Sequence, residues 1–283
     1  MGKWYNVINT VRKPPCKGER KMTFSDWIFS RYPANSSRDG QWMFPHILTL
    51  CICVALTVFF ALFFRKKSKN ARTWVIKGLV IGILVLEMLR RIINYADGDA
   101  VNLFTTLFLI LPRPWEAISC WLLIASVFVD KKFMYNFSAI NALLCAVIFF
   151  AYPMKGFDSR YLLFENWYYI LTYSLLLVTS VTMMTLGFTD FRYKRKTFKN
   201  GFMGEAIAFG CLFVYAIFEI FVLGIANDPM GFMPQGLWAR TLGLPYGVYL
   251  TLYIVALAAW VNAFYGVSAL WRRYKRKKEK TNE

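Results

Sequence analysis

The sequence predicts an all-α membrane protein, a polytopic bundle of about seven transmembrane helices. Of its 283 residues, 57% are hydrophobic, and the mean hydropathy is +0.40. This apolar share is well above that of an ordinary soluble domain. Apolar runs long enough to cross a bilayer, about 20 residues each, recur along the chain, and most basic residues lie between them. We therefore expect lipid to surround most of the chain.

Seven stretches are apolar enough to be spans, and the third is the least regular. It contains Leu111, Pro112, Arg113 and Pro114, and the two prolines should break or kink a helix. If Leu103–Leu111 is only a half-helix, the count falls to six. The seven expected spans are Phe44–Phe64, Trp74–Tyr95, Leu103–Val129, Phe133–Tyr152, Phe164–Gly187, Phe202–Ala226 and Tyr246–Trp271.

The spans divide the chain into three parts. Residues 1–42 form a basic N-terminal arm, in which Trp4–Val11 or Phe24–Phe29 is expected to lie in the membrane interface. Residues 43–272 form a single transmembrane helical domain, and residues 273–283 form a basic cytoplasmic tail. No internal repeat or separate soluble domain is evident.

The net charge of +18 is distributed unevenly among the links. With seven spans, the basic links all face one side, which the positive-inside rule places in the cytoplasm. The N-terminal arm is also basic, but only Arg31 and Arg38 lie close enough to the first span to count. We expect a multi-pass protein of the cell (plasma) membrane with its N-terminus outside and its C-terminus in the cytoplasm. The basic side holds Arg65, Lys66, Lys67, Lys69, Arg72, Lys131, Lys132, Arg192, Lys194, Arg195, Lys196 and Lys199, followed by the tail.

The same patterns exclude several other classes of protein. No aromatic-plus-basic motif supports nucleic-acid binding. Five of the six cysteines lie inside apolar runs, with no CxxC pair, and a single histidine cannot complete a typical structural zinc site with them. We therefore expect no metal, no cofactor and no nucleic-acid partner.

Ionisable residues inside spans are costly, so each one is a candidate site residue. Once the spans are oriented, nearly all of them fall at one depth, in the outer half of the membrane, with Glu205 as the exception. A polar cavity open to the outer leaflet explains this shared depth. The alternative is that charges near helix ends reach the interface by snorkelling. The candidate ligand-binding residues are His46, Glu87, Arg90, Arg91, Glu116, Tyr173, Glu219 and Asn227.

Single residues in this set have structural explanations as well. Glu87 and Arg91 are spaced i, i+4 and can form an ion pair on one helix face, although either arginine could instead hold a phosphate. His46 fits a hydrogen-bonded structural role better than a catalytic one. Cys120, one turn after Glu116, is a candidate nucleophile that a neighbouring carboxylate disfavours. The candidate catalytic residues are Glu116, His46, Cys120 and Tyr173.

A resemblance appears in the same residues. "FPHILTL", a basic link, "VLEMLRRIINY", "LPRPWEAIS", "FEIFVLGIAND" and "LGLPYGVYLTLYIVALAAW" follow one another over residues 42 to 270. Their order and spacing resemble the YwaF-like family of bacterial membrane proteins, which is related to eukaryotic transmembrane acyltransferases of ether-phospholipid metabolism. The resemblance implies site roles for His46, Glu87, Arg90, Arg91 and Asn227.

The chain departs from the pattern of that family at the positions of its proposed catalytic residues. Where the family has Leu-Pro-x-His-x-Cys, Pro114 replaces the histidine and Glu116 replaces the cysteine that is the proposed acyl-carrying nucleophile. Span five of the family supplies a second histidine, and Tyr173 stands at or next to that position here. Covalent acyl transfer needs a nucleophile beside a base, so the resemblance implies a divergent member without this chemistry.

Three functions follow as expectations. The first is a protein that binds a phospholipid or another amphiphile in an outer-leaflet cavity, with membrane lipids and a membrane-protein partner as its contacts. The second is an active acyltransferase or hydrolase that uses Glu116 near His46. The third is a small transporter or channel, although no repeated half or pair of broken helices supports transport. Whether the protein is an enzyme stays open, with the first function favoured.

Overall fold

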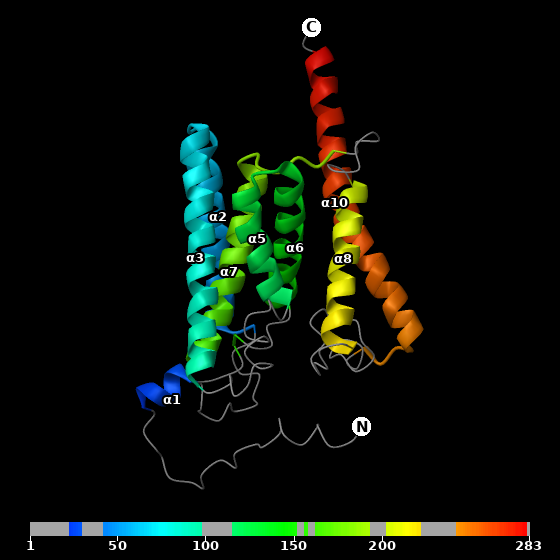
Figure 1. Cartoon of the computed structure of the whole chain (residues 1–283). Helices are drawn as coiled ribbons and strands as arrows, with labels where there is room; N and C mark the ends of the chain where they lie inside the picture. The colour runs from blue at the N-terminus through cyan, green and yellow to red at the C-terminus, as the bar shows by residue number, and fades with distance from the viewer. Residues whose placement is uncertain are drawn as a thin grey trace.

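The computed structural model describes residues 23–29, 42–97, 115–151, 156–157, 162–192, 202–221 and 242–281. These residues are almost entirely helical and contain no strand, which confirms the predicted all-α class (Figure 1). The described helices are α1 (Phe24–Ile28), α2 (Phe44–Arg65), α3 (Lys69–Ala96), α5 (Trp115–Val129), α6 (Lys132–Ala151), α7 (Phe164–Thr185), α8 (Phe202–Phe221) and α10 (Tyr246–Thr281).

Each predicted span corresponds to one of these helices, but not all of them meet the requirements of a span. Among the described residues, four helices are long and apolar enough to cross a membrane: Phe44–Arg65, Lys132–Ala151, Phe164–Thr185 and the Tyr246–Tyr274 part of α10. Trp115–Val129 and Glu205–Phe218 are apolar but shorter. The chain is therefore a helical protein with several membrane-compatible helices, and the count of seven stays a prediction.

Two helix boundaries differ from those predicted. α3 begins at Lys69, and its 28 residues would extend about 42 Å, but its six charged side chains lower its apolar character. α10 continues through the basic segment to Thr281, so this part of the expected tail extends the last helix. The expected half-helix Leu103–Leu111 lies outside the described residues.

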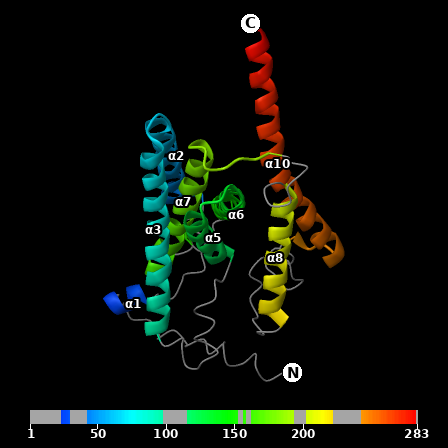
Figure 2. The same cartoon turned by 45° about the horizontal axis from the view of Figure 1, so that its top comes forward.

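Helices α6 and α7 form the centre of the bundle. α6 packs against α5 and α7, and α7 also contacts α2 and α3. Figure 1 shows α2 and α3 on one side, α8 and α10 on the other, and α5, α6 and α7 between them; the view in Figure 2 agrees. α8 contacts both α6 and α10.

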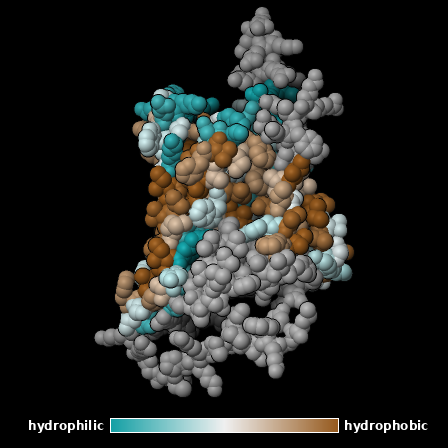
Figure 3. Space-filling model, in the orientation of Figure 1, coloured by the Kyte–Doolittle hydropathy of each residue, from teal (hydrophilic) through white to brown (hydrophobic). Residues whose placement is uncertain are grey.

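The outer helices expose their apolar faces. α2 exposes large side chains such as Phe59 and Leu62, and α10 exposes Val255 and Val267. Figure 3 shows a belt of hydrophobic surface at mid-height, while hydrophilic residues gather at the upper end. Such wide apolar surfaces are unusual on soluble monomers and suit contact with lipid.

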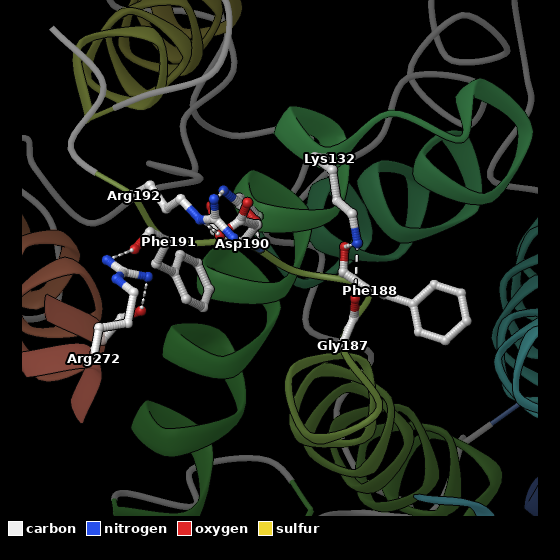
Figure 4. A network of polar contacts seen from close by, with 9 residues as sticks. Lys132, Gly187, Phe188, Asp190, Phe191, Arg192 and Arg272 are labelled. Atoms are coloured by element: carbon white, nitrogen blue, oxygen red, sulfur yellow. Dashed lines mark hydrogen bonds and ion pairs between the residues drawn. The ribbon is translucent and has the colours of Figure 1, made fainter. Parts of the chain in front are cut away.

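One end of the bundle carries the basic turns, and we call it the basic end. It contains the 65–68 turn, the 130–131 turn and the segment 186–192. α7 ends there in a Schellman motif, because Gly187 adopts a φ of +81° and Phe188 N donates to Met183 O at 3.0 Å. The segment then crosses to α10, where Arg272 Nη2 donates to Phe191 O at 2.8 Å (Figure 4).

The short helix α1 matches the expected interfacial segment Phe24–Phe29. Its capping box pairs Thr23 with Asp26. Trp27 Nε1 donates to Leu162 O at 2.7 Å, and the Trp27 ring packs edge-on against Phe164. These contacts fix α1 to the start of α7, at the end of the bundle opposite the basic end. The other expected interfacial segment, Trp4–Val11, lies outside the described residues.

Candidate functional site

Three helices bring most of the predicted site residues together. Glu87, Arg90 and Arg91 come from α3, Glu116 from the first turn of α5, and Tyr173 from α7. Arg91 Nε lies 3.4 Å from Glu87 Oε2, which confirms the predicted i, i+4 ion pair. Glu87 is fully buried, whereas the Arg91 side chain keeps part of its surface exposed. The ion pair therefore joins the buried face of α3 to its more exposed side.

The remaining contacts join different helices. Arg90 Nη1 lies 3.7 Å from Glu116 Oε1, and Tyr173 donates its hydroxyl hydrogen to Glu116 Oε2 at 3.3 Å. Tyr168 donates to Glu87 Oε1 at 2.5 Å. We call Glu87, Arg90, Arg91, Glu116, Tyr168 and Tyr173 the acid–arginine cluster. It connects α3, α5 and α7 through side chains alone.

Aromatic rings cover both guanidinium groups. The Arg90 guanidinium carbon lies 4.9 Å from the centre of the Tyr168 ring, and that of Arg91 lies 5.6 Å from the Trp121 ring. Such cation–π contacts stabilise a guanidinium where water is scarce. The rings therefore replace part of the hydration that the two arginines lose in the bundle.

The cluster is electrically balanced and unequally buried. Glu87 and Glu116 are buried, whereas the side chains of Arg90 and Arg91 keep 16% and 14% of their surface exposed. Two carboxylates face two guanidiniums, which offsets the cost of placing charges in a poorly hydrated region. The arginines are thus the less buried charged groups of the cluster, with Arg90 Nε, Arg91 Nε and Arg91 Nη2 on the buried side.

A second buried network positions Glu116. Trp115 Nε1 donates to Asn141 Oδ1 at 2.7 Å, and Asn141 Nδ2 donates to Ser119 Oγ at 2.7 Å. Ser119 Oγ in turn donates to Trp115 O at 2.9 Å. Because this network joins the first turn of α5 to α6, it fixes the helical turn from which Glu116 projects.

His46 lies in an aromatic pocket beside the cluster. Its Nδ1 accepts a hydrogen bond from Trp42 N at 3.2 Å, and its ring stacks parallel to Phe150 and contacts Phe157. The neighbouring Phe149 stacks on Tyr173 with ring centres 4.0 Å apart. These contacts agree with the structural role expected for His46.

The other candidates lie elsewhere. Cys120 is fully buried in the hydrophobic core, where a large ligand cannot reach it without rearrangement. Glu205, the expected exception in depth, is buried and accepts a hydrogen bond from Tyr265 at 2.5 Å. Asn227 and the side chain of Glu219 lie outside the described residues, as do residues 98–114.

The sequence reasoning missed Tyr168 and Trp121, although both contact the charged residues. An aromatic residue in a span usually indicates packing or an interfacial position, so composition gave no reason to single them out. A usable signal was the excess of tyrosines in the first turns of α7, which face charged positions of α3. Within the described ranges, no group of three His, Cys, Asp or Glu side chains is placed to hold a metal ion.

The chain was compared with known protein families, curated proteins and solved structures, and none of them matched. The geometry of the cluster therefore has to carry any functional argument.

Proposed function

We propose that this protein is a multi-pass plasma-membrane protein that binds a phospholipid headgroup at the acid–arginine cluster, from the outer leaflet. The observation that carries this proposal is the pair Arg90 and Arg91. They are partly exposed, charged, and held at one edge of the bundle by two buried carboxylates. Planar guanidiniums suit bidentate recognition of phosphate.

The ion-pair lengths support a ligand-receptive arrangement. Both pairs, at 3.4 and 3.7 Å, are longer than charge-assisted hydrogen bonds, which are about 2.7–2.9 Å. The glutamates orient the guanidiniums at these distances.

The depth of the cluster supports a lipid ligand. Arg90 lies six residues before Ala96, the last residue of α3, which corresponds to about 9 Å along the helix axis. If α3 ends at the outer surface of the membrane, this depth is near the boundary between the hydrocarbon core and the headgroups. A lipid phosphate can approach it from the leaflet, whereas a soluble ligand must first enter the interface.

The contacts of the candidate catalytic groups favour binding over covalent chemistry. Glu116 pairs with Arg90 and accepts from Tyr173, and Cys120 is enclosed in the core. The contacts described for His46 are with Trp42 and with aromatic rings. The sequence resemblance predicts the same outcome, because Pro114 and Glu116 stand where the YwaF-like family has its histidine and cysteine.

Native mass spectrometry of the full chain, purified in mild detergent, tests the proposal. The double variant Arg90→Gln/Glu116→Gln removes one ion pair without leaving a buried charge unpaired. We expect the affinity for the retained phospholipid to be about tenfold or more lower in this variant than in wild type. The reason is that a charge-assisted contact contributes about 1.5–3 kcal/mol. The matched control is Asp190→Asn/Arg192→Gln, which removes an exposed ion pair at the basic end. Equal retention in all three proteins would refute headgroup binding at the cluster.

A further inference from the structure

A cavity lies at the basic end, away from the acid–arginine cluster. Its volume is about 480 Å³, and it lies between the start of α3, the α5–α6 turn and the end of α7. Along α3, 18 residues or about 27 Å separate Arg72 in this cavity from Arg90 in the cluster. The cavity is therefore a separate feature, and nothing in the function proposed above depends on it.

The lining of the cavity is strongly cationic. Four basic side chains line it, and the single carboxylate among the lining residues is Asp130. That carboxylate already accepts a hydrogen bond from Tyr135 at 3.0 Å. An excess of three positive charges in one cavity of this size favours an anionic ligand. The basic lining residues are Lys69, Arg72, Lys77 and Lys132.

Two of these cations are held in place by the end of α7. Lys132 Nζ donates to Gly187 O at 2.7 Å and to Phe188 O at 2.9 Å, as Figure 4 shows. Arg72 Nη1 donates to Leu186 O at 3.0 Å. Arg72 Nε is buried and has no hydrogen-bond partner within the described part of the chain. A buried donor of this kind is costly, and an anion in the cavity would satisfy it.

The positive-inside rule alone does not explain this arrangement. That rule requires basic residues near the links, and it accounts for the presence of Lys69, Arg72 and Lys132. It does not explain why these three line the cavity, whereas the link cations Arg65, Lys66, Lys67 and Lys131 do not. Arg72 and Lys77 instead project from inside α3, one and two turns after its first residue. Helix positions that converge on a cavity indicate a binding role beyond topology.

The backbone adds to the positive potential. α3 begins at Lys69, where Ser68 caps the helix by accepting from Ala71 N at 3.3 Å, and α6 begins at Lys132. Both helix N-termini therefore lie at the cavity, and each contributes a partial positive charge.

We propose that this cavity binds the phosphate of an anionic phospholipid from the leaflet at the basic end. Val127, Leu186 and Phe188 supply an apolar wall beside the cations, which suits the glycerol and first acyl carbons better than a free inorganic ion. Basic pockets between transmembrane helices on the cytoplasmic side are a known solution for anionic headgroups. The volume exceeds that of a phosphate alone and lies within the range of ligand pockets.

The test measures binding of short-chain phosphatidylglycerol to the full chain in detergent, with zwitterionic phosphatidylcholine as the comparison that has no net charge. The variant Lys69→Gln/Lys77→Gln removes two cavity cations, neither of which forms a described hydrogen bond to another helix. We expect its affinity for phosphatidylglycerol to fall roughly 30-fold, since each cation near an anionic lipid contributes about 1 kcal/mol. The control Lys66→Gln/Lys67→Gln removes the same charge from the adjacent link and is expected to change affinity less than about threefold. Unfolding temperatures of all proteins verify that both variants fold.

Three results would overturn the proposal. An equal loss of affinity in both variants would show a general surface-charge effect. Equal binding of phosphatidylglycerol and phosphatidylcholine by wild type would exclude recognition of an anionic headgroup. Direct binding of inorganic phosphate or glycerol phosphate at millimolar concentration, with no binding of the lipid itself, would assign the cavity to a soluble phosphate. Variants of Arg90 and Glu116 should leave this binding unchanged, which separates its failure from that of the function proposed above.

Discussion

Arg90 of α3 and Glu116 of α5 form an ion pair of 3.7 Å between two helices that meet near the start of α5. Glu116 also accepts a hydrogen bond from Tyr173 of α7, so one carboxylate connects three helices. This connection holds the Arg90 guanidinium at the edge of the bundle, where it keeps part of its surface exposed. The predictions on stability and ligand binding at this end follow from that relationship.

The ion pair predicts strong coupling between its two residues. Arg90→Gln leaves the Glu116 carboxylate buried without its cation and should lower the free energy of unfolding by about 3–5 kcal/mol. Adding Glu116→Gln should restore part of that loss, with an interaction energy of about 0.5–3 kcal/mol. Unfolding of the four proteins in detergent measures the cycle. Strictly additive effects would mean that the two side chains do not interact.

The hydroxyl of Tyr168 should contribute to the stability of the fold, apart from the contact of its ring with Arg90. Tyr168→Phe keeps the ring over Arg90 but removes the hydrogen bond to Glu87. We expect a loss of about 1.5–3 kcal/mol in stability, because the acceptor is a buried charged group. Tyr95→Phe, at an exposed position near the end of the same α3, is the control and should be nearly neutral. Equal stability of Tyr168→Phe and wild type would contradict the hydrogen bond.

The sequence predicted the features that depend on local patterns, and it missed those that depend on how the helices pack against one another. Apolar runs and basic links predicted each long helix, because lipid requires that backbone hydrogen bonds be satisfied within a segment. The spacing of Glu87 and Arg91 predicted their pair for a similarly local reason. The contacts of Tyr168 and Trp121 were not predicted, because which side chain reaches Glu87, Arg90 or Arg91 depends on the rotation of α5 and α7 against α3. The basic-end cavity was missed because Lys69, Arg72 and Lys132 were interpreted only as topology signals and Lys77 was not singled out.

Close packing around Tyr173 predicts a sensitive glycine. A Cβ at Gly156 would lie 2.7 Å from Phe149 Cζ, and Phe149 stacks on Tyr173. Gly156→Ala should therefore shift both rings, lower stability by about 1–3 kcal/mol and weaken phospholipid retention. In Gly210→Ala the new Cβ meets no atom within 4 Å, so this helical control should be neutral or slightly stabilising. Native mass spectrometry and thermal unfolding of the two variants provide the comparison. Wild-type behaviour of Gly156→Ala would show that the aromatic packing tolerates displacement.

The orientation is a prediction of its own. With the basic end in the cytoplasm, a fluorescent protein fused after Glu283 of the full chain should fluoresce, because it folds in the cytoplasm, and alkaline phosphatase at the same position should be inactive. The reason is the concentration of lysine and arginine in the 65–72 link and along the last turns of α10. Active phosphatase with a dark fluorescent fusion would reverse the orientation and move the acid–arginine cluster to the cytoplasmic leaflet.

The most direct test of headgroup binding at the cluster is photocrosslinking with a phospholipid that carries a diazirine in its headgroup, followed by peptide mapping of the full chain in membranes. If the cluster binds the headgroup, adducts form at the end of α3 and in the first turns of α5, around Arg90 and Trp121. These adducts disappear in Arg90→Gln/Glu116→Gln and persist in Asp190→Asn/Arg192→Gln. Adducts confined to the lipid-facing surfaces of α2 and α10, unchanged in the cluster variant, would contradict headgroup binding there.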